Sequence, residues 1–127
     1  ALKDNDKAFR LKCAQSAFNA FIRLRDKRKG CVSCDKTSGW HGQWHCGHFK
    51  TVGARPDIRF NEDNAARQCS RCNNFLSGNI IEYKKTLELR IGKKRVAKLD
   101  EQSIRKYSCE ELKAIELKYK AKLKDIE

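Results

Sequence analysis

The chain has 127 residues, enough for one domain with a modest hydrophobic core. Its 29 Lys and Arg against 16 Asp and Glu give a net charge of +13, which favours a polyanionic partner, with nucleic acid as the first expectation. No apolar run approaches the ~18 residues of a membrane-spanning helix, and we identify no signal peptide. We therefore expect a soluble, intracellular protein. The absence of Met and the start at Ala1 predict a piece trimmed from a longer protein.

The first predicted element is a helix over residues 7–28, because apolar residues recur there at the spacing of one helix face, among basic and amide residues. These apolar residues are Leu11, Ala14, Phe18, Phe21 and Ile22. Gly30 ends the helix, and residues 31–45 are too rich in Gly, Ser, Lys and His for a regular element. This stretch predicts a knuckle and a loop.

A small β-hairpin is predicted next. Residues 43–49 alternate between polar and apolar side chains as a short strand does. Residues 58–60 are the expected partner strand, since Gly53 and Pro56 are turn signals between the two segments. A short helix is expected to begin near residues 69–70 and to break at residues 77–78.

Two longer helices are predicted in the last third of the chain. Asn79 is expected to cap the first with Glu82 reaching back, and Gly92 stands where a C-terminal glycine belongs. Ser108 and Glu111 form a capping-box pattern ahead of the second helix, whose apolar stripe we expect to pack on the first helix of the chain. The stripe consists of Leu112, Ile115, Tyr119, Leu123 and Ile126.

Four of the seven cysteines fall into two Cys-x-x-Cys pairs. The two-residue spacer lets both sulfurs of a pair turn toward one ion at ~2.3 Å, so the pairs predict a structural zinc site of four thiolates. Redox-active or buried thiols are the alternative. The 34 residues between the pairs exceed the usual ribbon spacing and indicate an insert with a function of its own. The predicted ligands are Cys31, Cys34, Cys69 and Cys72.

The predicted fold class is α+β with a small β part and flanking helices. We expect a single domain over residues 1–127. It would consist of a basic amphipathic helix over residues 1–30, a zinc knuckle and hairpin core over residues 31–79, and basic helices over residues 80–127.

Candidate catalytic residues lie in and just after this insert. A His on the hairpin strand, an Asn in the following loop and an Asn directly after the second Cys pair resemble the H-N-N form of the HNH nuclease motif. Further motifs in the same order look like the phage NinG (Rap) recombination endonucleases. The residues that carry this resemblance are His48, Asn64, Asn73 and the runs 58–62, 68–73, 77–79 and 90–92.

The resemblance implies a ββα-metal core (HNH, His-Me finger) in an endonuclease that acts on branched DNA, such as Holliday junctions and D-loops. It further implies the cytoplasm of a bacterial host cell, with recombination proteins as partners. In the family pattern His48 is the general base, Asn64 orients His48 by a hydrogen bond, and Asn73 offers its carbonyl oxygen to Mg²⁺ or Mn²⁺. Independently, phosphodiester hydrolysis needs a base to activate water and a cation to neutralise charge, so an imidazole beside a divalent ion suffices.

One position departs from the common HNH pattern. Gly47 stands where that pattern has an acidic metal ligand. His45 is the nearest substitute, because residues two apart on a strand share a face. An imidazole ligand favours softer divalent ions than Mg²⁺, so Mn²⁺, Co²⁺ or Ni²⁺ are expected to support activity. Taken singly, each candidate residue also has a non-catalytic alternative. A His near cysteines can be a spare zinc ligand or a surface residue, and an Asn after a knuckle can be a helix cap.

Basic residues predict the surface that contacts DNA. Residues 84–98 carry seven Lys or Arg and one acid, and this density favours phosphate binding without sequence readout. Basic residues around the hairpin are expected to hold the phosphate near His48, Arg59 above all. The predicted set is Lys50, Arg55, Arg59, Arg67, Lys84, Lys85, Lys93, Lys94 and Arg95.

Two other functions stay open at this point. A non-catalytic zinc-knuckle adaptor for DNA or RNA would not need the set of His48, Asn64 and Asn73. An HNH nuclease of another specificity would need side chains that read bases, which we cannot identify. Symmetric cutting of a four-way junction would call for two active sites related by a two-fold axis, so we expect a homodimer through the terminal helices.

Overall fold

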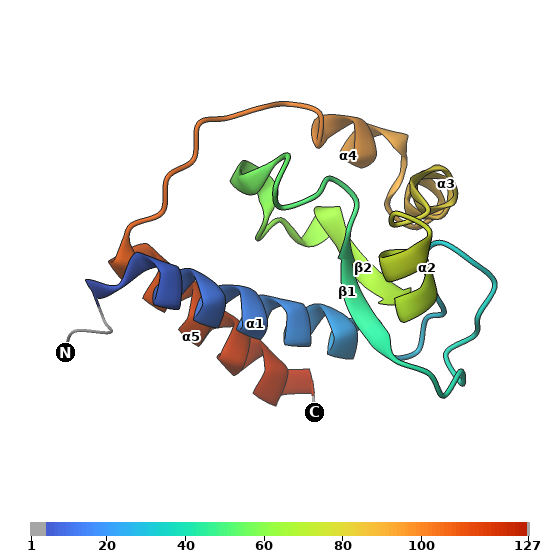
Figure 1. Ribbon diagram of the computed structural model, residues 1–127, viewed down its shortest axis with the longest axis horizontal. Coiled ribbons are helices and arrows are strands. Elements are labelled where there is room, and N and C mark those ends of the chain that lie inside the picture. The colour runs from blue at the N-terminus through green and yellow to red at the C-terminus, as the bar shows by residue number, and fades with distance from the viewer. Residues whose placement is uncertain (1–4, 127) are drawn as a thin grey trace.

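The computed structural model describes residues 5–126, and its elements form a mixed α+β arrangement, as predicted. The hairpin lies in the middle of the molecule, between one pair of long helices and three shorter helices (Figure 1). The elements are α1 (Lys7–Arg25), β1 (Trp44–His48), β2 (Ala65–Cys69), α2 (Ser70–Phe75), α3 (Ile80–Ile91), α4 (Lys93–Lys98) and α5 (Cys109–Ile126). No helix within residues 5–126 is long and apolar enough to cross a membrane.

Strands β1 and β2 form an antiparallel pair in which Trp44 lies opposite Cys69 and His48 opposite Ala65. The predicted partner, residues 58–60, is therefore wrong. That segment overlaps a 3₁₀ turn at Pro56–Ile58, where proline presets the backbone angle and removes a hydrogen-bond donor. All five residues of β2 are buried, so this strand lacks the alternation that marks a half-exposed strand.

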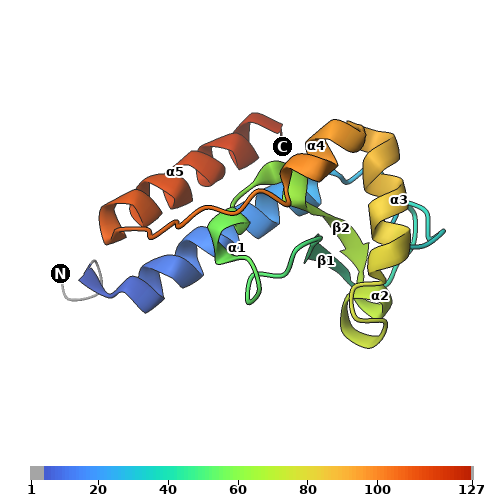
Figure 2. The same cartoon turned by 90° about the horizontal axis from the view of Figure 1, so that it is seen from above.

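The two terminal helices lie side by side and pack along their lengths (Figure 2). The predicted capping box is confirmed, because the Glu111 N–H donates to Ser108 Oγ at 3.1 Å and the Ser108 N–H donates to Glu111 Oε1 at 3.2 Å. Phe18 of α1 packs edge-on against Tyr119 of α5, with ring centroids 5.0 Å apart. The predicted stripe is confirmed along most of α5, and its last member, Ile126, is exposed.

Helix α3 begins and ends where predicted, but the prediction that the Asn79 side chain caps it is wrong. Asn79 adopts the left-handed conformation with φ 45°, and its Nδ2 donates to the carbonyl oxygen of Ser33 at 2.9 Å. Glu82 instead forms an ion pair with Lys85. Gly92 ends the helix with φ 88°, a value that glycine adopts without strain.

A fully buried carboxylate joins α1 to the hairpin. Asp26, the residue after α1, accepts hydrogen bonds from Arg25 Nε at 2.8 Å and from the backbone N–H of Arg67 at 3.1 Å. Burial alone would raise the pKa of Asp26, but the contacts with Arg25 and Arg67 hold the pKa below its usual value. The carboxylate therefore stays charged and fixes the end of α1 against β2.

Asp26→Ala is expected to lower the free energy of unfolding by about 3 kcal/mol, because it leaves the buried N–H of Arg67 without its acceptor and Arg25 without its carboxylate. Urea denaturation of zinc-loaded protein measures this loss. Asp125→Ala, at an exposed position of α5, is the matched control and should change stability little. Equal stability of the two variants would contradict the role assigned to Asp26.

Candidate functional site

Four cysteine sulfurs converge next to the hairpin. Cys31 and Cys34 come from the loop after α1, Cys69 ends β2, and Cys72 lies in α2. All four Sγ atoms lie within 4.8 Å of one another, and those of Cys34 and Cys69 are 3.8 Å apart. A tetrahedron with Zn–S bonds of ~2.3 Å has sulfur–sulfur edges of about 3.8 Å, so the cluster fits a zinc ion.

Backbone N–H groups point at these sulfurs. Ser33 and Cys69 donate to Cys31 Sγ at 3.4 and 3.3 Å, and Cys72 donates to Cys69 Sγ at 3.4 Å. Lys36 adds a positive charge, with its Nζ 3.7 Å from Cys34 Sγ. Such donors stabilise thiolates, the form in which cysteine binds zinc.

Gly47 is glycine because a neighbouring side chain fills its space. A Cβ at this position would lie 2.2 Å from Oε1 of Gln68. Gln68 is buried, and its Nε2 donates to Ser33 Oγ at 2.8 Å and to the carbonyl oxygen of Gly78 at 2.6 Å. An acidic side chain at position 47 would displace this network. Gln68 opens the run 68–73 but was not predicted as a site residue, because no local pattern marks this role.

His45 and Asn73 form a pair on one face of the hairpin. Nδ2 of Asn73 donates to Nδ1 of His45 at 2.9 Å. The two residues predicted to hold the catalytic cation are therefore adjacent. Within residues 5–126 the four cysteines are the only group of three or more His, Cys, Asp or Glu placed to hold a metal ion. A cation at His45 and Asn73 would take its remaining ligands from water or phosphate.

His48 points to the opposite face of β1. Its ring lies against Phe18 of α1, with centroids 6.0 Å apart and planes 28° from parallel. Its Nε2 lies 3.1 Å from the carbonyl oxygen of Arg59. Within the described residues no hydrogen bond joins His48 to Asn64, Asn73 or His45. The structure thus pairs His45 with Asn73 but does not bring His48 into contact with them.

The contact with Arg59 determines the tautomer of His48. A carbonyl oxygen can only accept a hydrogen bond, so Nε2 carries the proton and Nδ1 keeps its lone pair. Burial lowers the pKa of His48 below 6.5, and the hydrogen bond to Arg59 opposes this shift only in part. At neutral pH the ring is uncharged and can accept a proton at Nδ1.

The predicted hydrogen bond from Asn64 to His48 is wrong. Asn64 is fully buried, its Oδ1 accepts from the Lys50 N–H at 2.8 Å, and its Nδ2 donates to the Lys50 carbonyl oxygen at 2.9 Å. The side chain therefore holds the backbone two residues after His48. It positions the end of β1 and acts on the His48 ring only through the strand.

Two predicted DNA contacts, Arg55 and Arg67, are structural residues instead. Both are buried. Arg55 donates to both carboxylate oxygens of Asp57 at 2.9 and 2.8 Å and to the carbonyl oxygens of Leu99 and Glu101. Arg67 lies 3.8 Å above the ring of Trp44 and donates to a backbone carbonyl. The prediction for these two residues is wrong, because their guanidinium groups bind the protein itself.

The other predicted DNA contacts lie nearer the surface. Arg59 donates through Nε to Gln15 Oε1 at 2.8 Å, and no described residue bonds its terminal nitrogens. Gln15 was not predicted. Lys50 pairs with Asp100 at 2.9 Å, and Arg95 pairs with Asp63. The remaining lysines of the predicted set, Lys84, Lys85, Lys93 and Lys94, are exposed.

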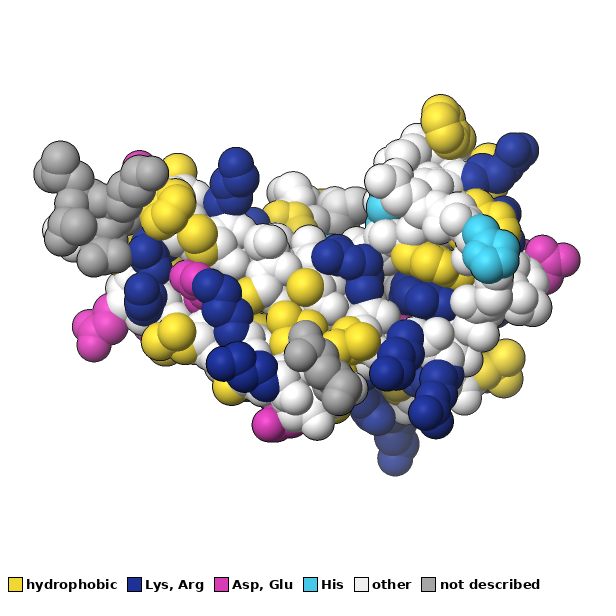
Figure 3. Space-filling view, turned by 90° about the horizontal axis from the view of Figure 1, so that it is seen from below, with side chains coloured by type: hydrophobic (Ala, Val, Ile, Leu, Met, Phe, Trp, Pro, Cys, Tyr) yellow, Lys and Arg dark blue, Asp and Glu magenta, His cyan; other side chains and the backbone are white. Residues whose placement is uncertain are grey.

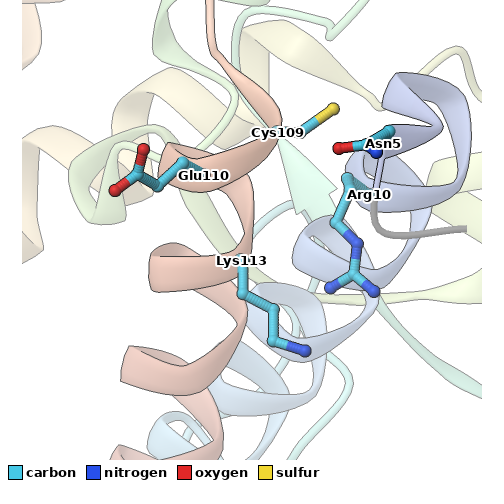
Figure 4. A pocket seen from close by; sticks show the side chains of 5 residues that line it. All are labelled: Asn5, Arg10, Cys109, Glu110 and Lys113. Atoms are coloured by element: carbon cyan, nitrogen blue, oxygen red, sulfur yellow. The ribbon is translucent and has the colours of Figure 1, made fainter. Parts of the chain in front are cut away.

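Basic side chains cover more of the molecular face in Figure 3 than acidic ones do. A separate hollow of about 320 Å³ lies between the start of α1 and α5, where Cys109 and Arg10 face the gap between the helices (Figure 4). Arg10 is held there by Glu116 at 3.3 Å. This hollow contains none of the candidate catalytic residues.

Comparison with known proteins identifies the relatives of this chain. Residues 1–127 match the family described as Bacteriophage Lambda NinG protein. The chain belongs to the NinG family. It is 41% identical over 121 residues to protein ninG of Escherichia phage lambda, and 40% identical over 121 residues to the ninG proteins of Escherichia phage 933W and Salmonella phage P22.

These matches cover 94% of the chain but only 58–59% of each NinG relative. The chain therefore spans less than two thirds of the length of these proteins. No solved structure matched the chain.

Cys69→Ser is expected to abolish zinc binding and most of the cooperative fold, because structural zinc supplies on the order of 10 kcal/mol to small domains of this kind. Metal analysis of purified protein should find about one zinc ion per chain in the wild type. Cys109→Ser, outside the cluster, is the control and should keep its zinc. If Cys69→Ser retained its zinc, the assignment of a four-thiolate site would be wrong.

Proposed function

We propose that this chain is a metal-dependent DNA endonuclease of the HNH, or ββα-metal, type. The observation that carries the proposal is the state of His48. Its Nε2–H is bound to the Arg59 carbonyl oxygen, its ring is partly buried against Phe18, and its Nδ1 is left as an acceptor. A neutral, oriented imidazole is what a general base for phosphodiester hydrolysis requires.

In the proposed reaction Nδ1 of His48 takes a proton from the attacking water. The imidazolium that forms is stabilised by the charge-assisted hydrogen bond from Nε2–H to the Arg59 oxygen. Phe18 restrains the ring, and Asn64 holds the adjoining backbone at Lys50. These contacts keep the base in place without a carboxylate partner.

His45 and Asn73 would hold the divalent cation once the hydrogen bond between Asn73 Nδ2 and His45 Nδ1 is broken, because this frees an imidazole lone pair and lets Asn73 turn its carbonyl oxygen to the cation. A cation there would neutralise charge on the phosphate and on the leaving oxygen. Asn73 directly follows Cys72, so the zinc cluster would position this ligand. Mg²⁺ prefers oxygen ligands, whereas the imidazole of His45 favours Mn²⁺, Co²⁺ or Ni²⁺.

Because His45 and His48 lie on opposite faces of β1, one scissile phosphate would meet both only if one of the two side chains changed its orientation. Arg59 is placed to hold it, because its carbonyl oxygen already orients His48 and no described residue forms a hydrogen bond with its terminal nitrogens. The exposed lysines of α3 and α4 would bind flanking phosphates.

Branched recombination intermediates, Holliday junctions and D-loops, are the proposed substrates. Phosphate binding by exposed lysines reads shape rather than sequence, which suits such substrates. A homodimer, recombination proteins as partners and action in the cytoplasm of a bacterial host remain predictions.

His48→Ala is expected to lower the rate of junction cleavage by 10²-fold or more, on the order of what a general base contributes, while zinc content and DNA affinity stay unchanged. The measurement is cleavage of a labelled four-way junction and a matched linear duplex with Mg²⁺ or Mn²⁺. His41→Ala, an exposed histidine of the zinc loop, is the control and should cleave normally. If no form of the protein cuts DNA with any divalent ion while all bind it, a non-catalytic adaptor is the correct function.

The cleavage rate should also report the pKa of His48. The base acts when unprotonated, and burial lowers its pKa, so activity should persist at neutral pH and fall only on acidification below pH 6.5. The pH profile of kcat/KM, with zinc content checked at each pH, measures this limb. A midpoint above 6.5 would be inconsistent with a buried base.

A further inference from the structure

Apolar side chains protrude from the end of α2, beside the candidate site. Phe75 is 79% exposed, Leu76 46% and Ile81 74%. Phe75 lies two residues after Asn73 on the same short helix. Large apolar side chains grouped at a surface mark contact sites more often than chance exposure. We call Phe75, Leu76 and Ile81 the apolar tip.

The apolar tip is held away from the core by the turn that follows it. Ser77, Gly78 and Asn79 all have positive φ, at 50°, 79° and 45°, a conformation that glycine adopts freely, asparagine tolerates and serine adopts only with some strain. The turn is tied to the zinc knuckle, because Ser33 Oγ donates to the Gly78 carbonyl oxygen at 3.0 Å and Asn79 Nδ2 donates to the Ser33 oxygen. The tip is therefore presented by a rigid support.

Exposed cations lie within about one helical turn of Phe75 and Ile81 on the same helices. Arg71 is exposed and lies one helical turn before Phe75, on the same side of α2. Lys84 and Lys85 are exposed on α3 just after Ile81, and Lys85 pairs with Glu82 at 3.2 Å. In Figure 3 a hydrophobic side chain protrudes at the end of the molecule that carries α2, next to a Lys or Arg side chain.

This combination fits nucleic acid better than protein. An aromatic ring flanked by cations matches a base flanked by phosphates, since every base offers a face for stacking. Two copies of the chain joined at this tip would bring Arg71, Lys84 and Lys85 of one copy toward the same cations of the other, and like charges oppose that contact. Bases inside an intact duplex are already stacked, whereas those at a branch point are exposed or easily opened.

We propose that Phe75, flanked by Leu76 and Ile81, is a wedge that stacks on an unpaired or unstacked base at the branch point of DNA. The proposal rests on the proposed function and deepens it, because it identifies the feature of branched DNA that the chain binds. The wedge lies next to Asn73, so a base stacked on Phe75 would bring the adjoining phosphate toward the candidate site.

The test is equilibrium binding of the full, zinc-loaded chain to a four-way junction and to a matched linear duplex, with no divalent ion added. The junction carries the fluorescent base 2-aminopurine at the branch point. Phe75→Ala should weaken junction binding about tenfold, the scale of one stacked base, and should abolish the fluorescence change. Binding to the linear duplex should stay within twofold.

Two further variants keep the test specific. Phe75→Trp preserves a stacking surface and should bind the junction as the wild type does. Ile104→Ala removes a side chain that is 96% exposed in the segment between α4 and α5, and should change neither affinity. The zinc content of every variant is measured, because loss of zinc rather than of the wedge would also weaken binding.

The wedge is overturned if Phe75→Ala binds the junction as tightly as the wild type, whether or not the protein cleaves DNA. It is also overturned if Phe75→Ala abolishes self-association in sedimentation and leaves junction affinity unchanged, because the tip would then join two copies. Binding that depends on Phe75 without cleavage by any form supports the wedge and refutes the nuclease. If the protein cleaves DNA and Phe75→Ala binds the junction as the wild type does, the nuclease is supported and the wedge is refuted.

Discussion

The cluster of four cysteines is the constraint on which the rest of the molecule depends. It joins three segments of the chain: the loop after α1 supplies Cys31 and Cys34, the end of β2 supplies Cys69, and α2 supplies Cys72. A hairpin of two five-residue strands is too small to be stable by itself. A zinc ion held by the four thiolates would supply the cross-link that a short sheet cannot, and Cys69 and Cys72 lie where α2 starts. The start of α2 in turn determines where Asn73 and the apolar tip lie.

Buried polar side chains stabilise the hairpin further by forming hydrogen bonds with backbone groups. Gln68 fills the space beside Gly47 and reaches the turn at Gly78, Asn64 closes on both backbone groups of Lys50, and Asp26 holds β2 through Arg67. Each satisfies groups that would otherwise be buried without a partner. Together they make the hairpin rigid on both faces. A rigid strand matters here because β1 carries His45 on one face and His48 on the other.

The charge of the molecule serves two separate purposes. Arg55 and Arg67 are turned inward and bind carbonyl groups of distant segments, so they contribute to the fold. The lysines of α3 and α4 stay exposed, and in the proposed function they bind the phosphates of DNA. A count of basic residues cannot separate these uses. Membership of the NinG family agrees with a phage role, and the chemistry proposed for that role rests on His48 rather than on charge.

The sequence by itself determined the features that depend on neighbouring residues. The paired cysteines, the periodic faces of α1 and α5 and the Ser108 capping box all follow from short spacings, because local geometry repeats wherever those spacings occur. The family membership rests on identity along nearly the whole chain. Only the tertiary structure decided which strand pairs with β1, that Asn64 binds Lys50, and that Arg55 is buried. Those outcomes depend on groups 14 to 46 residues away along the chain. An arginine that binds distant carbonyl oxygens has the same local sequence as one that binds DNA, so folding alone distinguishes them.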